Sequence, residues 1–308
     1  MFASLLIFAA QIAPVLAPNI TVPLGPAPRR VEQAIAPIEK AGPEFAAACK
    51  DWDEWDKPAP PVRIFGNTYY VGTCGISAIL ITDKAGDILI DGGTDKGADL
   101  IAANIRSLGF RLRDIKYLLI SHEHFDHAGG IAKLQRMTGA QLVSSPAAAA
   151  ALNSGVASAG DPQAGMNAPF PAAHVDRVIR EGEMLRLGDT IVAPIATPGH
   201  TPGALTWHWG ACDGGVCRQI VYADSLSPIS RNDYRFSDHP EYVAAYRAGI
   251  AKVAALDCDI LITPHPSASE MVARFGGSKP LVNRDACRDY AADIGKRLDE
   301  RLAKEAKH

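Results

Sequence analysis

The sequence predicts an α/β protein in which two β-sheets face each other and helices cover their outer sides. The 308-residue chain has 47% apolar and 21% charged residues, ordinary proportions for a globular protein with a sizeable core. Short apolar runs typical of strands fall into two groups, and helical patterns follow each group. No pattern repeats with a period of 20–50 residues, which argues against a solenoid. We therefore expect a single two-sheet domain.

The first 17 residues are apolar and resemble a signal peptide. They end in Val15-Leu16-Ala17, a small-residue cleavage pattern, and the apolar stretch is too short to span a membrane. Two features depart from the usual pattern: no Lys or Arg precedes the apolar run, and Pro18 follows the expected cleavage point. We expect a periplasmic protein in which residues 18–308 form one domain.

The chain next forms an arm and then the first group of strands. Residues 18–61 are rich in Pro and Ala and are expected to lie over the core, with a short helix at 43–50. The pattern then predicts strands at 62–71, 78–82, 87–90, 115–120 and 141–144, with turns at Gly66-Asn67 and Lys84-Ala85-Gly86. Helices are expected at 96–108, 131–137 and 146–152.

A long segment without periodicity separates the two groups of strands. Residues 153–173 are rich in Gly, Ala, Pro and Ser. A loop of this length in a compact domain usually has a function. We expect it to form one wall of an active-site groove.

The second group of strands resembles the first in pattern. We assign to it strands near Arg177 and at 183–187, 191–195, 204–209, 219–222 and 259–262. Helices are expected at 241–256 and from Ser267 and Arg284 onward.

The most informative stretch directly follows the strand at 115–120 and reads Ser121-His122-Glu123-His124-Phe125-Asp126-His127. In an extended chain His122 and His124 point to the same side, whereas Glu123 points away and is expected at a solvated rim. Asp126 and His127 break this alternation, so the backbone turns there. Imidazole and carboxylate groups suit zinc or iron. We interpret the stretch as half of each of two neighbouring metal sites, in preference to a polar loop with incidental histidines.

Two further histidines follow strands on rigid loops. His200 lies between two Pro-Gly steps, and His265 lies between Pro264 and Pro266. Prolines exclude these positions from a helix interior or a central strand and fix the direction of the side chain. Both are candidate metal ligands. The remaining histidines lack such a setting: His208 reads as structural, and the others are His174, His239 and His308.

The strand at 219–222 ends in Asp224-Ser225-Leu226-Ser227. The two serines are spaced two apart, so they face one side and could hold a water or a substrate carboxylate. An ordinary turn is the alternative.

Cysteine number and net charge narrow the class of protein. Six cysteines suit an oxidising compartment, but they allow fifteen pairings in principle. A cysteine zinc site is the rival interpretation, and no Cys-x-x-Cys supports it. The net charge of −3 gives no reason to expect nucleic acid.

With these residues placed, the chain resembles the metallo-β-lactamase superfamily from about residue 43 to the end, and most closely its subclass B3. The resemblance implies a four-layer αβ/βα sandwich of two mixed β-sheets flanked by helices. It implies two Zn²⁺ ions, one held by His122, His124 and His200 and the other by Asp126, His127 and His265. Asp126 would also orient the attacking water. By the same resemblance Ser225 faces the second metal and Ser227 meets the substrate carboxylate.

The resemblance also implies an activity and a set of disulfides. The expected reaction is hydrolysis of the β-lactam amide of penicillins, cephalosporins and carbapenems, which confers antibiotic resistance. The pairing of Cys258 with Cys287 resembles the subclass disulfide, and two further pairs resemble bridges of some members, Cys49–Cys74 and Cys212–Cys217. We expect a monomer that acts on a small molecule, with neither nucleic acid nor a membrane anchor in the mature form.

Two rival functions remain at this stage. Hydroxyacylglutathione hydrolases and acyl-homoserine lactonases share the His-x-His-x-Asp-His motif, and there an Asp near the position of Asp224 bridges both metals. Spacing alone leaves open whether Asp224 does so here. A secreted binding protein with an idle site is the non-enzyme rival, and the presence of all six candidate ligands argues against it.

Overall fold

A computed structural model describes residues 38–50 and 54–307 of the chain. The expected signal peptide at 1–17, residues 18–37 of the expected arm and His308 lie outside the described residues. Within the described part, no helix is both long and apolar enough to cross a membrane.

The first sheet has seven strands in sequence order. Its first four strands form an antiparallel meander, and the last three run parallel to the fourth, so the sheet is mixed. The strands are β1 (Val62–Phe65), β2 (Thr68–Tyr70), β3 (Ile79–Asp83), β4 (Gly86–Ile90), β5 (Ile115–Leu119), β6 (Gln141–Ser144) and β7 (Val175–Val178).

The second sheet has five strands in the order β12-β11-β10-β9-β8. All neighbours are antiparallel except β11 and β12, which are parallel. The strands are β8 (Leu185–Leu187), β9 (Thr190–Ala196), β10 (Leu205–Asp213), β11 (Val216–Tyr222) and β12 (Ile260–Ile262).

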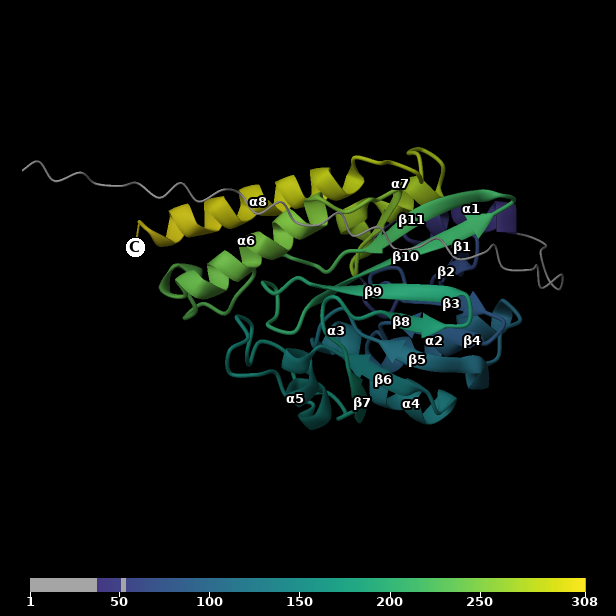
Figure 1. Ribbon diagram of the computed structural model, residues 1–308, viewed down its shortest axis with the longest axis horizontal. Coiled ribbons are helices and arrows are strands. Elements are labelled where there is room, and N and C mark those ends of the chain that lie inside the picture. The colour runs from purple at the N-terminus through teal and green to yellow at the C-terminus, as the bar shows by residue number, and fades with distance from the viewer. Residues whose placement is uncertain (1–37, 51–53, 308) are drawn as a thin grey trace, which may run out of the picture.

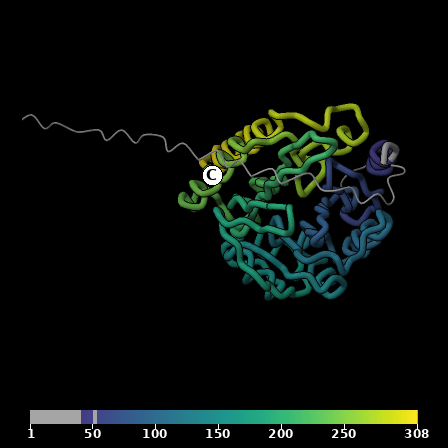
Figure 2. Tube along the Cα trace, turned by 45° about the vertical axis from the view of Figure 1, so that its right-hand side comes forward, coloured from purple at the N-terminus to yellow at the C-terminus, as the bar shows by residue number. Residues whose placement is uncertain are grey.

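Helices cover the outer side of each sheet (Figure 1). On the first sheet lie α2 (Asp95–Ser107), α3 (Phe125–Ala128), α4 (Ile131–Thr138) and α5 (Pro146–Ser154), and on the second lie α6 (Pro240–Ala254) and α8 (Ala286–Glu305). The α1 helix (Ile38–Ala48) packs on α7 (Met271–Phe275). Short 3₁₀ turns occur at η1 (Leu112–Asp114), η2 (Phe236–Asp238) and η3 (Pro266–Ser269). Figure 2 shows the blue and teal half of the chain below the green and yellow half.

Local sequence explains where the helices begin and end. The hydroxyl of Thr94 accepts a hydrogen bond from Gly97 N (2.9 Å) at the start of α2, and Ser145 caps α5 in the same way at Ala148 N (3.1 Å). Pro146 takes the first position of α5, where its missing N–H costs nothing. Gly155 ends this helix in the left-handed region (φ 72°), which suits glycine.

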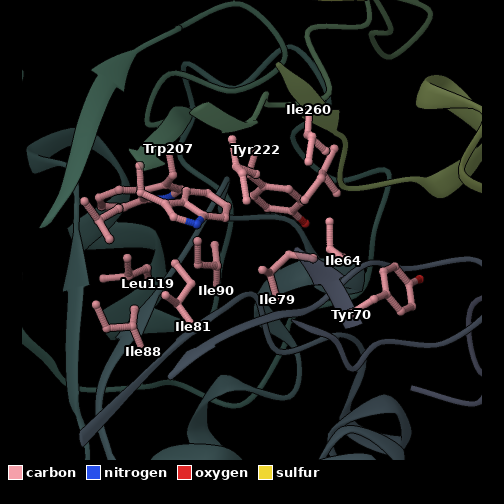
Figure 3. Close-up of a cluster of buried hydrophobic side chains, with 14 of the residues drawn as sticks. Ile64, Tyr70, Ile79, Ile81, Ile88, Ile90, Leu119, Trp207, Tyr222 and Ile260 are labelled. Carbon is pink, nitrogen blue, oxygen red and sulfur yellow. The ribbon is translucent and has the colours of Figure 1, made fainter. Parts of the chain in front are cut away.

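The central strands bury both of their faces. In β3, Ile79 and Ile81 point into the core between the sheets, whereas Leu80 points into the core under the helices. This alternation explains why the strands read as continuous apolar runs. Figure 3 shows the inter-sheet core, where Trp207 and Tyr222 of the second sheet face isoleucines of the first. The Trp207 indole donates to the carbonyl of Ile120 (2.9 Å), so the two sheets are also joined by hydrogen bonding at the end of β5.

The predicted four-layer sandwich of two mixed sheets is confirmed, with local differences. The sequence pattern predicts the strand near Arg177 in the second group, and this prediction is wrong: β7 pairs in parallel with β6 and belongs to the first sheet. The predicted strand 62–71 is divided into β1 and β2 at the expected Gly66-Asn67 turn. The turn after His124 contains a short helix, α3, which the pattern did not indicate.

Three disulfides stabilise the fold, two between segments that are distant in the chain and one within a hairpin. They are Cys49–Cys74, Cys212–Cys217 and Cys258–Cys287, with sequence separations of 25, 5 and 29 residues. Cys212 and Cys217 lie opposite each other in the β10–β11 hairpin. Cys258 precedes β12 and Cys287 lies in the first turn of α8, so this disulfide ties a covering helix to the strand that leads to His265.

Candidate metal centre

The site begins where β5 ends, and a buried carboxylate fixes the backbone there. Asp91 follows β4 with a left-handed backbone (φ 65°), and its carboxylate accepts hydrogen bonds from Ser121 N (2.6 Å) and Ser121 Oγ (2.7 Å). The Tyr222 hydroxyl, from the second sheet, donates to the same carboxylate at 2.7 Å. The start of the histidine-rich stretch is therefore held to both sheets.

Three histidines converge directly after this junction. The buried residues His122, His124 and His200 offer ligand nitrogens that lie within 4.8 Å of one another. Their ring centroids are 4.8–5.0 Å apart. Three imidazoles at this spacing form a pocket that fits one metal ion.

A second group lies beside the first. His122, Asp126 and His127 also offer ligand atoms within 4.8 Å of one another, so the two groups are adjacent. The α3 helix starts at Phe125 and turns Asp126 and His127 out of line with the strand. The imidazole Nε2 of His265 lies 3.3 Å from Asp126 Oδ2, and its ring centroid lies 5.1 Å from that of His127. The structure thus brings together all six predicted ligand side chains.

Each histidine of the first group has one ring nitrogen within hydrogen-bond distance of a carboxylate or carbonyl oxygen. His122 Nδ1 lies 2.8 Å from Asp224 Oδ1, and His124 Nε2 lies 2.9 Å from Asp161 Oδ2. His200 Nδ1 lies 3.0 Å from the carbonyl oxygen of Ser227. Such outer partners fix the tautomer and direction of a metal-binding imidazole. Among the described residues, the opposite nitrogen of His122, Nε2, is buried without a hydrogen-bond partner.

The second group shows a similar arrangement at His127. Its Nδ1 lies 3.4 Å from Asp91 Oδ2 and its Nε2 lies 3.1 Å from Asp126 Oδ2. Within the described part of the chain neither contact has hydrogen-bond geometry, so both ring nitrogens are buried without a directed partner. Buried polar atoms of this kind are rare in folded proteins unless a water or an ion satisfies them.

The electrostatics favour the metal-binding forms of three candidate ligands, His122, His200 and Asp126. Burial and the neighbouring imidazoles hold the pKa of His122 and of His200 well below the usual value, so both are neutral at pH 7. Burial alone would raise the pKa of Asp126, but His127 and His265 hold it well below its usual value, so this carboxylate is ionised. Burial opposes a charge on His124, yet the Asp161 carboxylate raises its pKa. At His127 burial opposes a charge, but the carboxylates of Asp126 and Asp91 raise the pKa to about 10. Neutral imidazole and ionised carboxylate are the forms that ligate a metal.

Glu123 differs from the prediction. It was expected at a solvated rim, but it is 1% exposed and accepts hydrogen bonds from Thr201 Oγ1 (2.8 Å) and Gly203 N (3.0 Å). Alternation along the chain gave its direction correctly, but the loop that carries His200 lies there in place of solvent. Burial raises the pKa of the Glu123 carboxyl. Glu123 therefore ties the first histidine pair to the loop of the third histidine.

The two candidate serines occupy different settings. Ser225 is buried, its carbonyl accepts from the Tyr290 hydroxyl (2.5 Å), and among the described residues its own hydroxyl has no hydrogen-bond partner. Ser227 is partly exposed, and its Oγ lies 3.0 Å from His200 Nδ1.

Two residues of the long loop, Asp161 and Gln163, also contact the histidines, and no local sequence pattern predicts this. The Gln163 amide nitrogen lies 3.3 Å from each ring nitrogen of His200. Only the length of the loop pointed to this segment. A cavity of about 390 Å³ adjoins the site. His124 lines it together with residues of the loop, which include Val156, Gln163, Met166 and Phe170.

The remaining histidines lie outside both metal-binding groups. His208 is buried in the middle of β10, where burial lowers its pKa to about 4. His174 is exposed, and His239 stacks on Tyr234 with ring centroids 4.6 Å apart.

Comparisons with known proteins agree with this geometry. A family model described as the metallo-beta-lactamase superfamily matches residues 71–217. The chain is similar to the structure of the MIM-2 metallo-beta-lactamase, with 55% identity, a TM-score of 0.83 and coverage of 86% of this chain and 98% of that one. It is also similar to MEM-A1, a subclass B3 metallo-beta-lactamase from a soil metagenome library, with 45% identity, a TM-score of 0.79 and coverage of 82% and 99%.

Among curated proteins, the similarity is more distant and more local. A hydroxyacylglutathione hydrolase of Methylobacterium nodulans is 31% identical over 110 residues, which are 36% of this chain. The match covers 34% of that protein, so this chain spans about a third of the length of that relative.

Replacing Glu123 tests its role in joining the two ligand loops. In the metal-free protein, Glu123→Ala leaves two buried donors without an acceptor, at a cost of about 1–3 kcal/mol each. We expect urea unfolding to show a loss of roughly 2–6 kcal/mol in unfolding free energy. Glu300→Ala, on a side chain that is 63% exposed, serves as the control. A Glu123→Ala protein within about 0.5 kcal/mol of this control would contradict the assigned role.

Proposed function

The chain belongs to the metallo-β-lactamase superfamily, where it is most like subclass B3, and on this premise we propose that it is a zinc-dependent hydrolase of β-lactam antibiotics. The observation that carries the proposal is the pair of adjacent ligand groups that share the stretch from His122 to His127. The protein would act in the periplasm after removal of residues 1–17 and would confer antibiotic resistance.

The residues present fit two zinc ions. His122, His124 and His200 would hold the first ion, and Asp126, His127 and His265 would hold the second. The unpartnered buried nitrogens of His122 and His127, the neutral imidazoles of His122 and His200 and the ionised Asp126 support this assignment. When bound, zinc supplies a Lewis acid and lowers the pKa of a bound water from about 15.7 to about 7.

The side chains of the site would divide the remaining tasks. The Asp126 carboxylate has two oxygens, so it can serve as a ligand and also accept a hydrogen bond that orients the attacking water. The Ser227 hydroxyl can accept from His200 Nδ1 and still donate its own proton to the carboxylate of the substrate. Ser225, which is buried beside Asp224 with a hydroxyl that lacks a partner in the described residues, would face the second metal.

The cavity beside His124 would receive the side chain of the antibiotic. Its walls are largely apolar, and Val156 and Met166 are half exposed there. Burial of such surface by a ligand is favourable by about 25 cal/mol per Å².

A thioester or lactone hydrolase with the same metals is the alternative. In those enzymes an Asp near the position of Asp224 bridges the metals. Here Asp224 Oδ1 lies 2.8 Å from His122 Nδ1, and Oδ2 accepts from Leu226 N at 3.2 Å. This engagement of both oxygens favours the β-lactamase.

The decisive test is a substrate panel with the zinc-loaded protein. We expect hydrolysis of penicillins, cephalosporins or carbapenems to exceed that of glutathione thioesters and homoserine lactones by orders of magnitude in kcat/KM. Asp126→Ala should lower kcat by about 10²–10⁴-fold, because the second zinc loses a ligand and the water loses the group that orients it. Faster cleavage of a thioester or lactone than of every β-lactam would contradict the proposal.

Ser227→Ala tests recognition of the substrate carboxylate. A hydrogen bond to a charged group contributes about 1.5–3 kcal/mol and acts alike on the ground and transition states. We therefore expect KM to rise roughly ten- to a hundred-fold with kcat nearly unchanged. Ser278→Ala, on an exposed turn, is the control and should leave both constants at wild-type values. An unchanged KM toward every β-lactam would contradict this role and would mean that Ser227 is only a turn residue.

A further inference from the structure

One buried carboxylate joins the long loop to the metal site. Asp161 lies in the segment 155–174, which has no helix or strand, and is 0% exposed. Its Oδ2 lies 2.9 Å from His124 Nε2, and its Oδ1 accepts from Gln163 N at 2.7 Å. Its carbonyl oxygen accepts from the Arg231 guanidinium at 3.0 Å. Both side-chain oxygens and the backbone of Asp161 are therefore engaged.

These contacts determine how His124 faces the first site. Because Nε2 meets Asp161, only Nδ1 of this imidazole is left for a ligand. His124 stands at the junction before α3, where its side chain makes no capping hydrogen bond. The Asp161 carboxylate thus sets the direction and tautomer of the His124 ring.

The same contact anchors the loop. At its two ends the segment is held by backbone bonds, from Phe170 N to Gly155 O (2.9 Å) and from Ala173 N to Leu152 O (2.9 Å). In its middle, Arg231 N donates to Pro162 O (2.9 Å), next to Asp161. Elsewhere in the segment, the side chains of Val156 and Met166 are 52% and 50% exposed. The side of the loop that faces the histidines is therefore held by the Asp161–His124 contact, together with the Gln163 amide beside His200.

We propose that Asp161 is a positioning residue that couples zinc binding to the order of the loop 155–174. It holds His124 with Nδ1 toward the zinc, and zinc in turn holds His124 against the loop. Such coupling is reciprocal, since an ordered loop tightens zinc binding by the same factor by which zinc orders the loop. The wall of the substrate cavity would then be more ordered in the zinc-loaded protein than in the metal-free protein. This inference rests on the zinc site of the proposed function and is independent of β-lactam hydrolysis.

The test measures zinc binding and backbone exchange in wild type, Asp161→Asn and the exposed control Asp299→Asn. In wild type and control, we expect saturating zinc to slow amide exchange in residues 155–174 more than in the distant hairpin turn 213–216. In Asp161→Asn, whose amide cannot accept at both former positions, we expect this zinc-dependent protection to be lost. Zinc affinity, from competition with a chelator, should fall about 10–100-fold for one of the two ions.

A spectroscopic readout separates positioning from general destabilisation. With Co²⁺ in place of zinc, Asp161→Asn should change the visible absorption of the bound ion, which reports ligand geometry, whereas the control should not. Wild-type affinity and an unchanged Co²⁺ spectrum in Asp161→Asn would overturn the proposal.

The wild-type exchange comparison decides the matter even if Asp161→Asn fails to fold: equal loop exchange with and without zinc would also overturn it. A wild-type protein that binds no zinc would overturn both this proposal and the metal centre. One that binds zinc, protects the loop and hydrolyses no β-lactam would overturn the proposed activity alone.

Discussion

The Asp91 carboxylate, buried where β4 ends, holds the part of the chain on which the site depends. It accepts from the backbone and hydroxyl of Ser121 and from the Tyr222 hydroxyl of the opposite sheet. A buried carboxylate is tolerated only when its oxygens are satisfied, so this network permits little movement at the end of β5. Every later feature, from the histidine pair to the turn into α3, starts from that fixed point.

Around this point, buried acidic groups surround the histidines. Asp161, Asp224 and Glu123 are each at most 1% exposed, and two of them contact imidazoles directly. Several buried acids so close together would be costly in a neutral pocket. Beside two divalent cations the same acids become favourable, because the ions are the largest local charges. The surroundings of the ligands, as well as the ligands, are therefore those of a metal centre.

The sequence was sufficient for features that depend on nearby residues. The positions of strands and helices follow from periodicity and caps. The ligand stretch was recognisable because four candidate ligand side chains come directly after one strand. Long-range pairing was less accessible: β7 was assigned to the wrong group because nothing local shows that it pairs with β6. Asp161 and Asp224 partner histidines 37 and 102 residues away, and the buried setting of Glu123 depends on a loop near Gly203.

The central claim is that one stretch after β5 supplies ligands to two neighbouring zinc ions. Anomalous diffraction at the zinc edge from crystals of the zinc-loaded protein tests it most directly. The account predicts two peaks, one about 2 Å from nitrogens of His122, His124 and His200, and one about 2 Å from ligand atoms of Asp126, His127 and His265. A single peak, or a second zinc held by Asp224 in place of one of these ligands, would contradict it.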